Sequence, residues 1–181
     1  MPTATKNLED DHVYILRLID VMERMVLTVS TNLPYIELAV NLIKNYADGY
    51  HHVKEEKLLF PMLVTKGFSN EQGPVAVMLH DHAEGRLFVK GMTETIALIK
   101  LGNASAFTRL YENMQGYIDL LRVHIGKENN VLFRMADKAL SPEEQRALLK
   151  SFEAVKTSNY NIGQLDRFIA EIEGLEAIYR S

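Results

Sequence analysis

Apolar side chains recur at every third or fourth position along most of this chain, the spacing that places them on one face of an α-helix. In the first stretch, about Asn7 to Thr31, they keep one register with His12 and comprise Ile15, Leu16, Ile19, Met22 and Val26. Runs of alternating β-branched residues bounded by turns, which are typical of strands, are missing from the sequence. The pattern therefore predicts an all-α protein.

Turn signals divide this pattern into four long helices. These helices are expected at about residues 7–31, 34–64, 74–101 and 104–139. A loop at residues 67–73 and a turn at Gly102 and Asn103 separate the later ones. Pro61 should kink or stop the second helix, because proline removes one backbone hydrogen bond and crowds the preceding turn.

A helical tail follows the four long helices. Ser141 and Glu144 form a capping box around Pro142, which predicts a fifth helix ending near Lys156. Residues 164–179 are predicted to form a sixth. No linker or low-complexity segment is visible, so we expect one domain with residues 141–181 packed on it.

One motif occurs twice in the chain, with the pattern H-x-x-K-E-x-x-[LV]-L-F-x-M. The first copy begins at His51 and contains Glu55, and the second begins at His124 and contains Glu128. An aspartate followed by a histidine precedes each copy, as Asp11-His12 and Asp81-His82. The chain thus consists of two helix pairs, each with one histidine on its first helix and His-x-x-x-Glu on its second.

This arrangement predicts a metal site. Residues four positions apart lie on one helix face, so a histidine and a glutamate with this spacing can bind one ion or two adjacent ions. Two such pairs facing each other in a bundle are a recurring setting for carboxylate-bridged dimetal centres. The candidate metal ligands are His12, His51, Glu55, His82, His124 and Glu128.

The repeat also separates these residues from their neighbours. His52 is matched by Ile125 and Glu56 by Asn129, so neither keeps its residue type in the other half. We expect His52 beside the site or facing solvent rather than as a ligand. His80 lies about 200° around the helix from His82 and is expected at the surface.

Composition narrows the chemistry. The chain has no cysteine, which excludes disulfides, iron–sulfur clusters and thiolate zinc sites, and leaves imidazole and carboxylate ligands suited to iron, manganese or zinc. A net charge of −4 gives no electrostatic basis for binding nucleic acid or anionic lipid. No apolar run is long enough to span a bilayer, and the polar start does not resemble a signal peptide, so we expect a cytoplasmic protein.

The chain resembles the hemerythrin-like, HHE cation-binding family over about its first 140 residues. The motifs that carry the resemblance are Asp11-His12, His51 to Glu56 with Leu59-Phe60-Pro61, Asp81-His82 with Gly85-Arg86, and His124 with Lys127-Glu128-Asn129 and Leu132-Phe133. The resemblance implies an up-down-up-down four-helix bundle in residues 1–140 around an oxo- or hydroxo-bridged pair of iron ions.

The resemblance also implies ligand roles. His12 and His51 would bind one iron, His82 and His124 the other, and Glu55 and Glu128 would bridge. Oxygen carriers of the family have a fifth histidine four residues before the equivalent of His82, where this chain has Met78. Their last carboxylate ligand is also an aspartate, five residues after the equivalent of His124. In this chain the corresponding residue is Glu128, four residues after His124. The match is therefore closer to the stress-linked, enzyme-like branch, and two open ligand positions would favour chemistry over oxygen storage.

Three functions follow as hypotheses. The first is a diiron protein that binds or reacts with oxygen, peroxide or nitric oxide in oxidative or nitrosative stress. Such a protein could act as a peroxidase, an oxidase or a nitric oxide-reactive enzyme. The second is a sensor or carrier of oxygen or nitric oxide, in which signalling would need a partner or a homodimer. The third is iron handling or repair of iron centres without turnover, with zinc or manganese as possible substitutes for iron. A ferritin-like oxidase is disfavoured, because that site uses Glu-x-x-His pairs.

Overall fold

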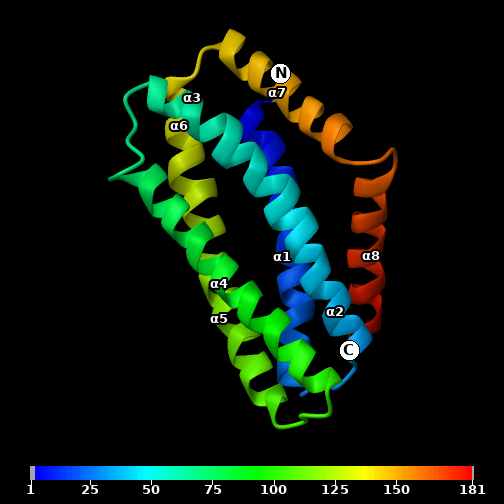
Figure 1. The fold of residues 1–181 in the computed structure, drawn as a ribbon. Helices are drawn as coiled ribbons and strands as arrows, with labels where there is room; N and C mark the ends of the chain where they lie inside the picture. Colours follow the sequence, from blue (N-terminus) through cyan, green and yellow to red (C-terminus); the bar gives the residue numbers. More distant parts are fainter. Residues whose placement is uncertain (1–2, 181) are drawn as a thin grey trace.

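The computed structural model describes residues 3–180, which form helices joined by loops without any strand (Figure 1). The predicted all-α class is confirmed. The predicted bundle, residues 1–140, and the predicted tail, residues 141–181, include residues 1–2 and 181, which lie outside the described range. No helix formed by residues 3–180 is long and apolar enough to cross a membrane.

Four antiparallel rods make up the bundle (Figure 1). The first is α1 (Ala4–Leu27) and the third is α4 (Pro74–Lys100). The other two are compound rods, in which α-helical and π-helical segments follow one another. The second contains α2 (Leu33–Leu42), η1 (Ile43–His52), η2 (Glu55–Leu59) and α3 (Phe60–Thr65), and the fourth contains α5 (Ala106–Lys127), η3 (Glu128–Leu132) and α6 (Phe133–Ala139).

The C-terminal segment returns to the first half of the chain. Helix α7 (Pro142–Asn159) starts with the predicted capping box at Ser141 and lies across the end of the bundle near α3 and α6 (Figure 1). Helix α8 (Gln164–Ile178) then runs beside α1 and α2. Phe152 of α7 and Ile172 of α8 are buried in the cores of the bundle. The division at residue 140 stays a prediction.

Several helix limits differ from the expected ones, and the structure gives the cause for two of them. Helix α1 begins at Ala4, because the Thr3 side chain accepts a hydrogen bond from the Lys6 N–H and caps it. The second rod does not stop at Pro61 but stays helical to Thr65. A π-helical turn immediately before Pro61 changes the hydrogen-bond register there, which lets the helix continue past a residue that has no N–H.

The apolar core is divided into two clusters. One cluster, which includes Leu8, Leu59 and Phe133, fills the end of the bundle covered by α7. The other, which includes Ile15 and Leu121, fills the opposite part together with α8. On all four rods the candidate ligands lie in sequence between residues of the two clusters, so they form a polar layer inside the bundle.

Glycines allow α4 and α5 to approach closely below this layer. A Cβ atom at Gly91 would lie 2.2 Å from Asn113 Oδ1, and one at Gly116 would lie 2.4 Å from Phe88 Cε1. Any larger residue at either position would therefore require the facing side chain to move. This close approach fixes the position of the third rod, which carries His82, against the fourth, which carries His124.

Candidate metal centre

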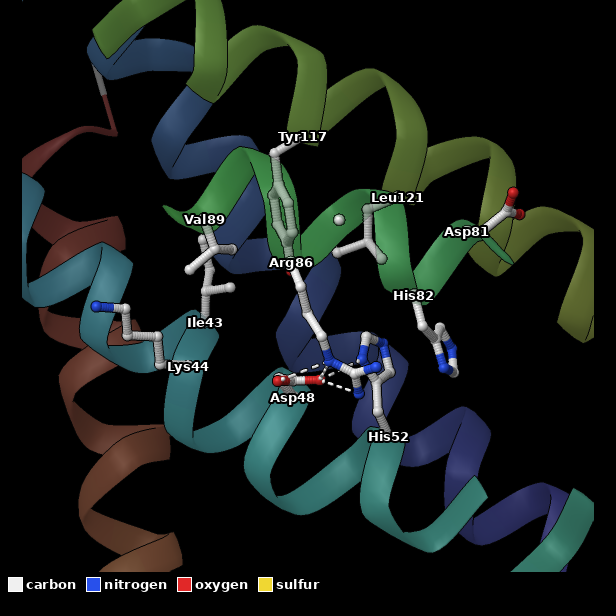
Figure 2. Close-up of a pocket in the computed structure, with 11 residues that line it drawn as sticks. Ile43, Lys44, Asp48, His52, Asp81, His82, Arg86, Val89, Tyr117 and Leu121 are labelled. Atoms are coloured by element: carbon white, nitrogen blue, oxygen red, sulfur yellow. Dashed lines mark hydrogen bonds and ion pairs between the residues drawn. The ribbon is translucent and has the colours of Figure 1, made fainter. Parts of the chain in front are cut away.

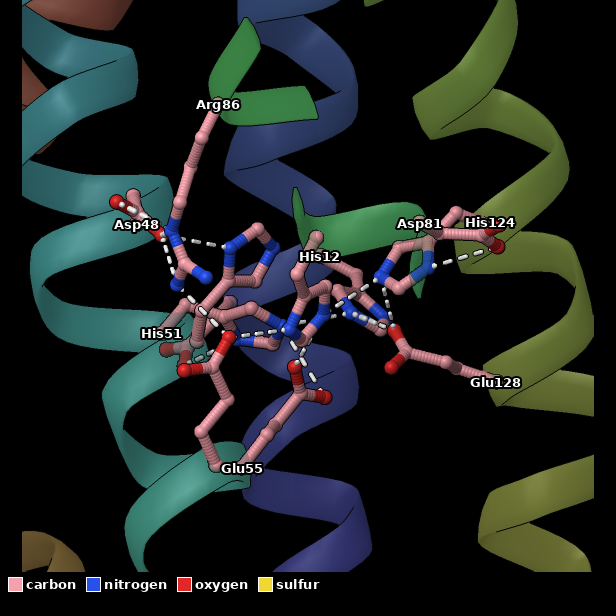
Figure 3. A network of polar contacts seen from close by, with 12 residues as sticks. His12, Asp48, His51, Glu55, Asp81, Arg86, His124 and Glu128 are labelled. Atoms are coloured by element: carbon pink, nitrogen blue, oxygen red, sulfur yellow. Dashed lines mark hydrogen bonds and ion pairs between the residues drawn. The ribbon is translucent and has the colours of Figure 1, made fainter. Parts of the chain in front are cut away.

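All six predicted ligands meet in the polar layer, and Figure 3 labels each of them except His82, whose contacts are given below. None of them is more than 2% exposed. The Nε2 atoms of His12 and His51 lie 2.9 Å apart, and those of His82 and His124 lie 3.2 Å apart. Each helix pair of the repeat therefore brings the Nε2 atoms of its two imidazoles together, with the ring planes inclined by 57° and 64°.

The two carboxylates lie between these imidazole pairs. Glu55 is 3.5 Å from His51 Nε2 and 3.4 Å from His82 Nε2. Glu128 is 3.2 Å from the Nε2 atoms of both His12 and His124. Each glutamate thus touches one histidine of either half, which is the position a bridging ligand needs.

These residues form two overlapping groups with metal-ligand spacing, whose ligand atoms lie within 4.8 Å of one another. One group contains His12, His51, Glu55 and Glu128, and the other contains His52, Glu55, His82 and His124. That the six predicted residues bind metal stays a prediction.

π-Helical segments begin at both glutamates. Segment η2 starts at Glu55 and η3 at Glu128, and in both the N–H five residues later bonds to the glutamate carbonyl. Such wide turns are frequent at functional sites, because the extra residue per turn re-aims the side chains around it. Here the same device occurs in both copies of the repeat.

Each imidazole of the four predicted ligand histidines turns its outer nitrogen toward an acceptor. The Nδ1–H groups of His12 and His82 donate to Asn129 Oδ1 at 2.7 Å and to Glu56 Oε1 at 2.8 Å. The Nδ1–H of His51 donates to Asp11 at 3.1 Å. Because carboxylate and amide oxygens can only accept, these bonds place a ring proton on Nδ1 and leave Nε2 as the nitrogen that faces the centre.

Sequence reasoning set Glu56 and Asn129 aside as unmatched, since their types differ. The structure gives them equivalent roles, because each accepts a hydrogen bond from the single histidine of the opposite half. Their equal positions in the two copies of the motif were the signal that could have identified them.

The aspartates before His12 and His82 support the other two histidines. Asp11 contacts His51, and Asp81 lies 3.4 Å from His124 Nδ1. The lysine of each repeated motif binds the aspartate of its own half, as Lys54 with Asp11 and Lys127 with Asp81.

The two lysines differ in environment. Lys54 is fully buried, donates to Asn7 at 2.8 Å and lies over the rings of Tyr50 and Phe152 at 4.3 and 5.3 Å. The Lys127 side chain is 41% exposed. Helix α7, which carries Phe152, therefore covers Lys54 in the first half of the centre. Lys127, the equivalent residue of the second half, stays at the surface.

His52 lies inside the protein beside the centre, and the expected alternative that it faces solvent is wrong. Its ring stacks on that of His82, with centroids 3.8 Å apart, and its Nδ1 donates to Asp48 at 3.1 Å. It is a fifth imidazole within reach of a metal ion at His82 and Glu55. His80 is exposed, as predicted, and lies 4.0 Å from Glu84.

Burial and close charges shift the acidities of the cluster. Burial and the facing Glu55 carboxylate raise the pKa of Glu128 to about 8. Burial opposes charge on Glu55 as well, but the imidazoles of His51 and His82 hold its pKa well below the ordinary value. Two buried carboxylates side by side cannot both ionise cheaply without added positive charge.

The unpaired atoms of the centre test whether metal ions fit it. Among the described residues, the buried side-chain atoms without a hydrogen-bond partner are both carboxylate oxygens of Glu55, both of Glu128, and His124 Nδ1. An unpaired buried polar group costs about 1–3 kcal/mol, and a charged one more. Cations between the imidazole pairs would satisfy all four oxygens, so the donor set fits a metal centre of imidazole and carboxylate ligands.

Comparisons with known proteins agree with this geometry. The family model of the Hemerythrin HHE cation binding domain matches residues 3–136. The iron-sulfur cluster repair protein YtfE of Pectobacterium atrosepticum is 36% identical over 89 residues, which is 48% of this chain and 40% of that protein. The iron-sulfur cluster repair protein DnrN of Neisseria gonorrhoeae is 33% identical over 85 residues, 46% of this chain and 54% of that protein. The matched part of the chain thus spans about half or less of the length of these relatives. No solved structure matches significantly.

Proposed function

The chain belongs to the hemerythrin HHE cation-binding family, and on that premise we propose that it holds a diiron centre and serves in the repair of damaged iron–sulfur clusters. His12 and His51 would bind one ion and His82 and His124 the other, with Glu55 and Glu128 shared by both. The observation that carries the proposal is that each glutamate lies between two histidines of different halves. His52 adds a fifth imidazole on the side of His82.

The residues around the ligands would orient them and adjust their charge. The Nδ1–H bonds to Asp11, Glu56 and Asn129 hold each ring with its free nitrogen inward. The Lys54 ammonium offsets the buried Asp11 carboxylate. When bound, a pair of irons supplies one-electron chemistry and binding of small ligands; zinc or manganese can occupy the same donors without equivalent redox chemistry.

The repair role rests on the relatives, two of which are named for iron–sulfur cluster repair. A role in the defence against nitric oxide or peroxide is the second candidate, because a cavity described below reaches the centre from outside. A sensor or carrier would bind the same molecules without turnover.

Metal content of anaerobically purified protein, measured by mass spectrometry, is the first test. We expect two irons per chain, and loss of both in the double variant Glu55→Gln/Glu128→Gln, which keeps the side-chain shape but removes the charge. Glu84→Gln, at the exposed end of an ion pair with His80, is the matched control.

Repair is tested by incubating the iron-loaded chain with an enzyme whose [4Fe–4S] cluster nitric oxide has damaged. We expect recovery of that enzyme's activity with the wild-type chain and not with the double variant. Two irons without recovery would remove the repair role and keep the diiron centre, whereas absence of iron would remove both.

A further inference from the structure

We propose that small neutral molecules reach the centre through one cavity, on the His82 side, and that Arg86 closes the mouth of this cavity. The proposal rests on the proposed diiron centre and specifies which half of it incoming ligands meet. Molecules of two heavy atoms, such as nitric oxide, oxygen and hydrogen peroxide, are the class that fits.

The cavity lies between η1, α4 and α5 and has a volume of about 60 Å³, enough for a few water-sized molecules (Figure 2). Its inner end is formed by His52 and His82. Its walls are mainly apolar and include Ile43, Val89, Tyr117 and Leu121. Since an ion would lose its hydration there without a matching partner, these walls favour uncharged molecules.

The cavity exists partly because position 85 has no side chain. Gly85 lines it, and a Cβ atom built there would lie 3.5 Å from Tyr117 Cε2, an ordinary contact distance. Alanine would therefore fit at this position and would narrow the cavity. Burial raises the pKa of the Tyr117 phenol, so this ring stays neutral and adds no charge to the wall.

Arg86 lies at the mouth, where its guanidinium is held by the carboxylates of Asp48 (Figure 2) and Glu56. Its Nε donates to Asp48 at 2.9 Å, and its Nη2 donates to Asp48 and to Glu56, both at 2.7 Å. The same two carboxylates accept from His52 and His82. The side chain is 42% exposed, so it can swing outward into water without unfolding either helix.

The His12 side of the centre is covered instead. Both single histidines stack on a phenylalanine, His12 on Phe133 and His82 on Phe60, with centroids 5.6 and 6.0 Å apart, so these contacts do not separate the two sides. The cavity, however, is lined by His52 and His82 and by neither His12 nor His51. Behind His51 lie Asp11 and the fully buried Lys54, which α7 covers. This contrast assigns entry to the His82 side.

Thiol labelling of the metal-free chain tests the passage without any dependence on iron. The chain has no cysteine, so Leu121→Cys places its only thiol on the cavity wall. The matched control is Ile118→Cys, one turn earlier on α5 and fully buried in the core. The label is hydrogen peroxide, a member of the class proposed to enter, which oxidises a thiol to a sulfenic acid that mass spectrometry of the cysteine peptide detects. We expect the thiol at 121 to react at least about tenfold faster, because the control can react only through local unfolding. Equal rates would overturn the proposal.

The role of Arg86 is tested in the same assay. Adding Arg86→Ala to Leu121→Cys should raise the labelling rate several-fold and leave the rate of Ile118→Cys unchanged. An unchanged rate at 121 would show that Arg86 does not close the mouth.

Ligand kinetics provide a second measurement, with nitric oxide as the probe on iron-loaded protein in a stopped-flow spectrometer. Gly85→Ala should slow association and dissociation by the same factor, since it narrows the path and leaves the bound state unchanged. Gly174→Ala, on the exposed face of α8, should change neither rate. Unchanged kinetics in Gly85→Ala would overturn the passage. Fast labelling at 121 in a chain that binds no iron would overturn the proposed diiron centre and leave the passage standing.

Discussion

Five histidines meet in the polar layer, and the partner of each outer nitrogen distinguishes their roles. His12, His51 and His82 each donate to an acceptor outside the centre, which is how metal-bound imidazoles are usually oriented. His52 donates to Asp48 at the mouth of the cavity. The histidines thus comprise the candidate metal ligands and one residue, His52, that connects them to the mouth of the cavity.

Replacement of His52 tests its share in the centre. We expect His52→Ala to weaken binding of one of the two metal ions by about 10- to 100-fold, the usual cost of losing a ligand's support or a weak ligand. A chelator competition assay measures this, with circular dichroism to check the fold. His80→Ala, at an exposed neighbour, should bind both ions as the wild type does, and an equal loss in both variants would contradict the assignment.

The metal-free chain should be most stable near pH 6.5. Burial and adjacent imidazoles lower the pKa of His12 to about 4 and of His52 to about 3, so the unfolded chain takes up more protons as the pH falls below 6.5 and stability drops. Against the effect of burial, nearby carboxylates raise the pKa of His51 to about 10 and of His82 to about 9. Their contribution is complete below pH 6.5 and is lost as the pH rises toward 10. Glu128, with its raised pKa, adds to the loss between pH 4.5 and 8.

Urea unfolding across a pH series in the presence of a chelator measures this profile. Iron loading should remove the alkaline decline, because the metal takes the place of the imidazole protons. A free energy of unfolding that rises steadily from pH 6.5 to 9 in the metal-free chain would contradict the pKa shifts.

That the six candidate ligands lie together could be predicted, because the repeat pairs residues of the same type. The repeat could not place the other polar residues of the layer. Glu56 and Asn129 have equivalent positions but differ in type, and His52 has no histidine at the equivalent position of the second half. Which nitrogen of a ring faces outward also depends on contacts between helices far apart in the sequence.

At the scale of elements, hydrophobic spacing predicted where the rods run, and turn residues predicted where they end. Neither of these two signals could predict the π-helical segments. A single wide turn leaves the apolar positions on nearly the same face, so segments of five residues at Glu55 and Glu128 do not disturb the pattern. The capping box at Ser141 was predictable because its residues act locally.

The turn that follows α1 contains a strained residue. Val29 has φ 49°, a left-handed conformation unfavourable for a β-branched residue, and its side chain is 62% exposed. Val29→Gly should therefore raise the free energy of unfolding by about 1 kcal/mol without loss of packing. Chemical denaturation measures the change.

The matched control for Val29 is Gly102, which follows α4 with φ 93° and has nothing near its missing side chain. Gly102→Ala should lower the free energy of unfolding by about 1 kcal/mol or more. A stabilising effect of both substitutions, or of neither, would show that backbone conformation does not decide these sites.

At the scale of the whole molecule, the two halves repeat in sequence but differ in burial. Lys54 and Lys127 occupy the same position of the motif and bind equivalent aspartates, yet only Lys54 is enclosed by α7. The sequence pattern could not predict this difference, because it arises from where the tail packs.

Alanine at each lysine tests the difference. Lys54→Ala leaves the Asp11 carboxylate buried without its cation and should cost about 3–5 kcal/mol of stability. Lys127→Ala breaks an exposed pair and should cost less than about 1 kcal/mol. Thermal and urea unfolding of the metal-free variants measure both, and similar losses would contradict the role given to α7.

Helices α7 and α8 continue from the second half of the chain but pack against the first, on α1, α2 and η2. The molecule can therefore be viewed as a tethered dimer of two helical hairpins. The C-terminal arm of the second hairpin, which consists of α7 and α8, packs on the outside of the first. Metal ions shared by Glu55 and Glu128 would staple the hairpins at the centre, whereas the arm joins them from outside. A chain that releases its metal thus keeps its hairpins at high local concentration, ready to be stapled again.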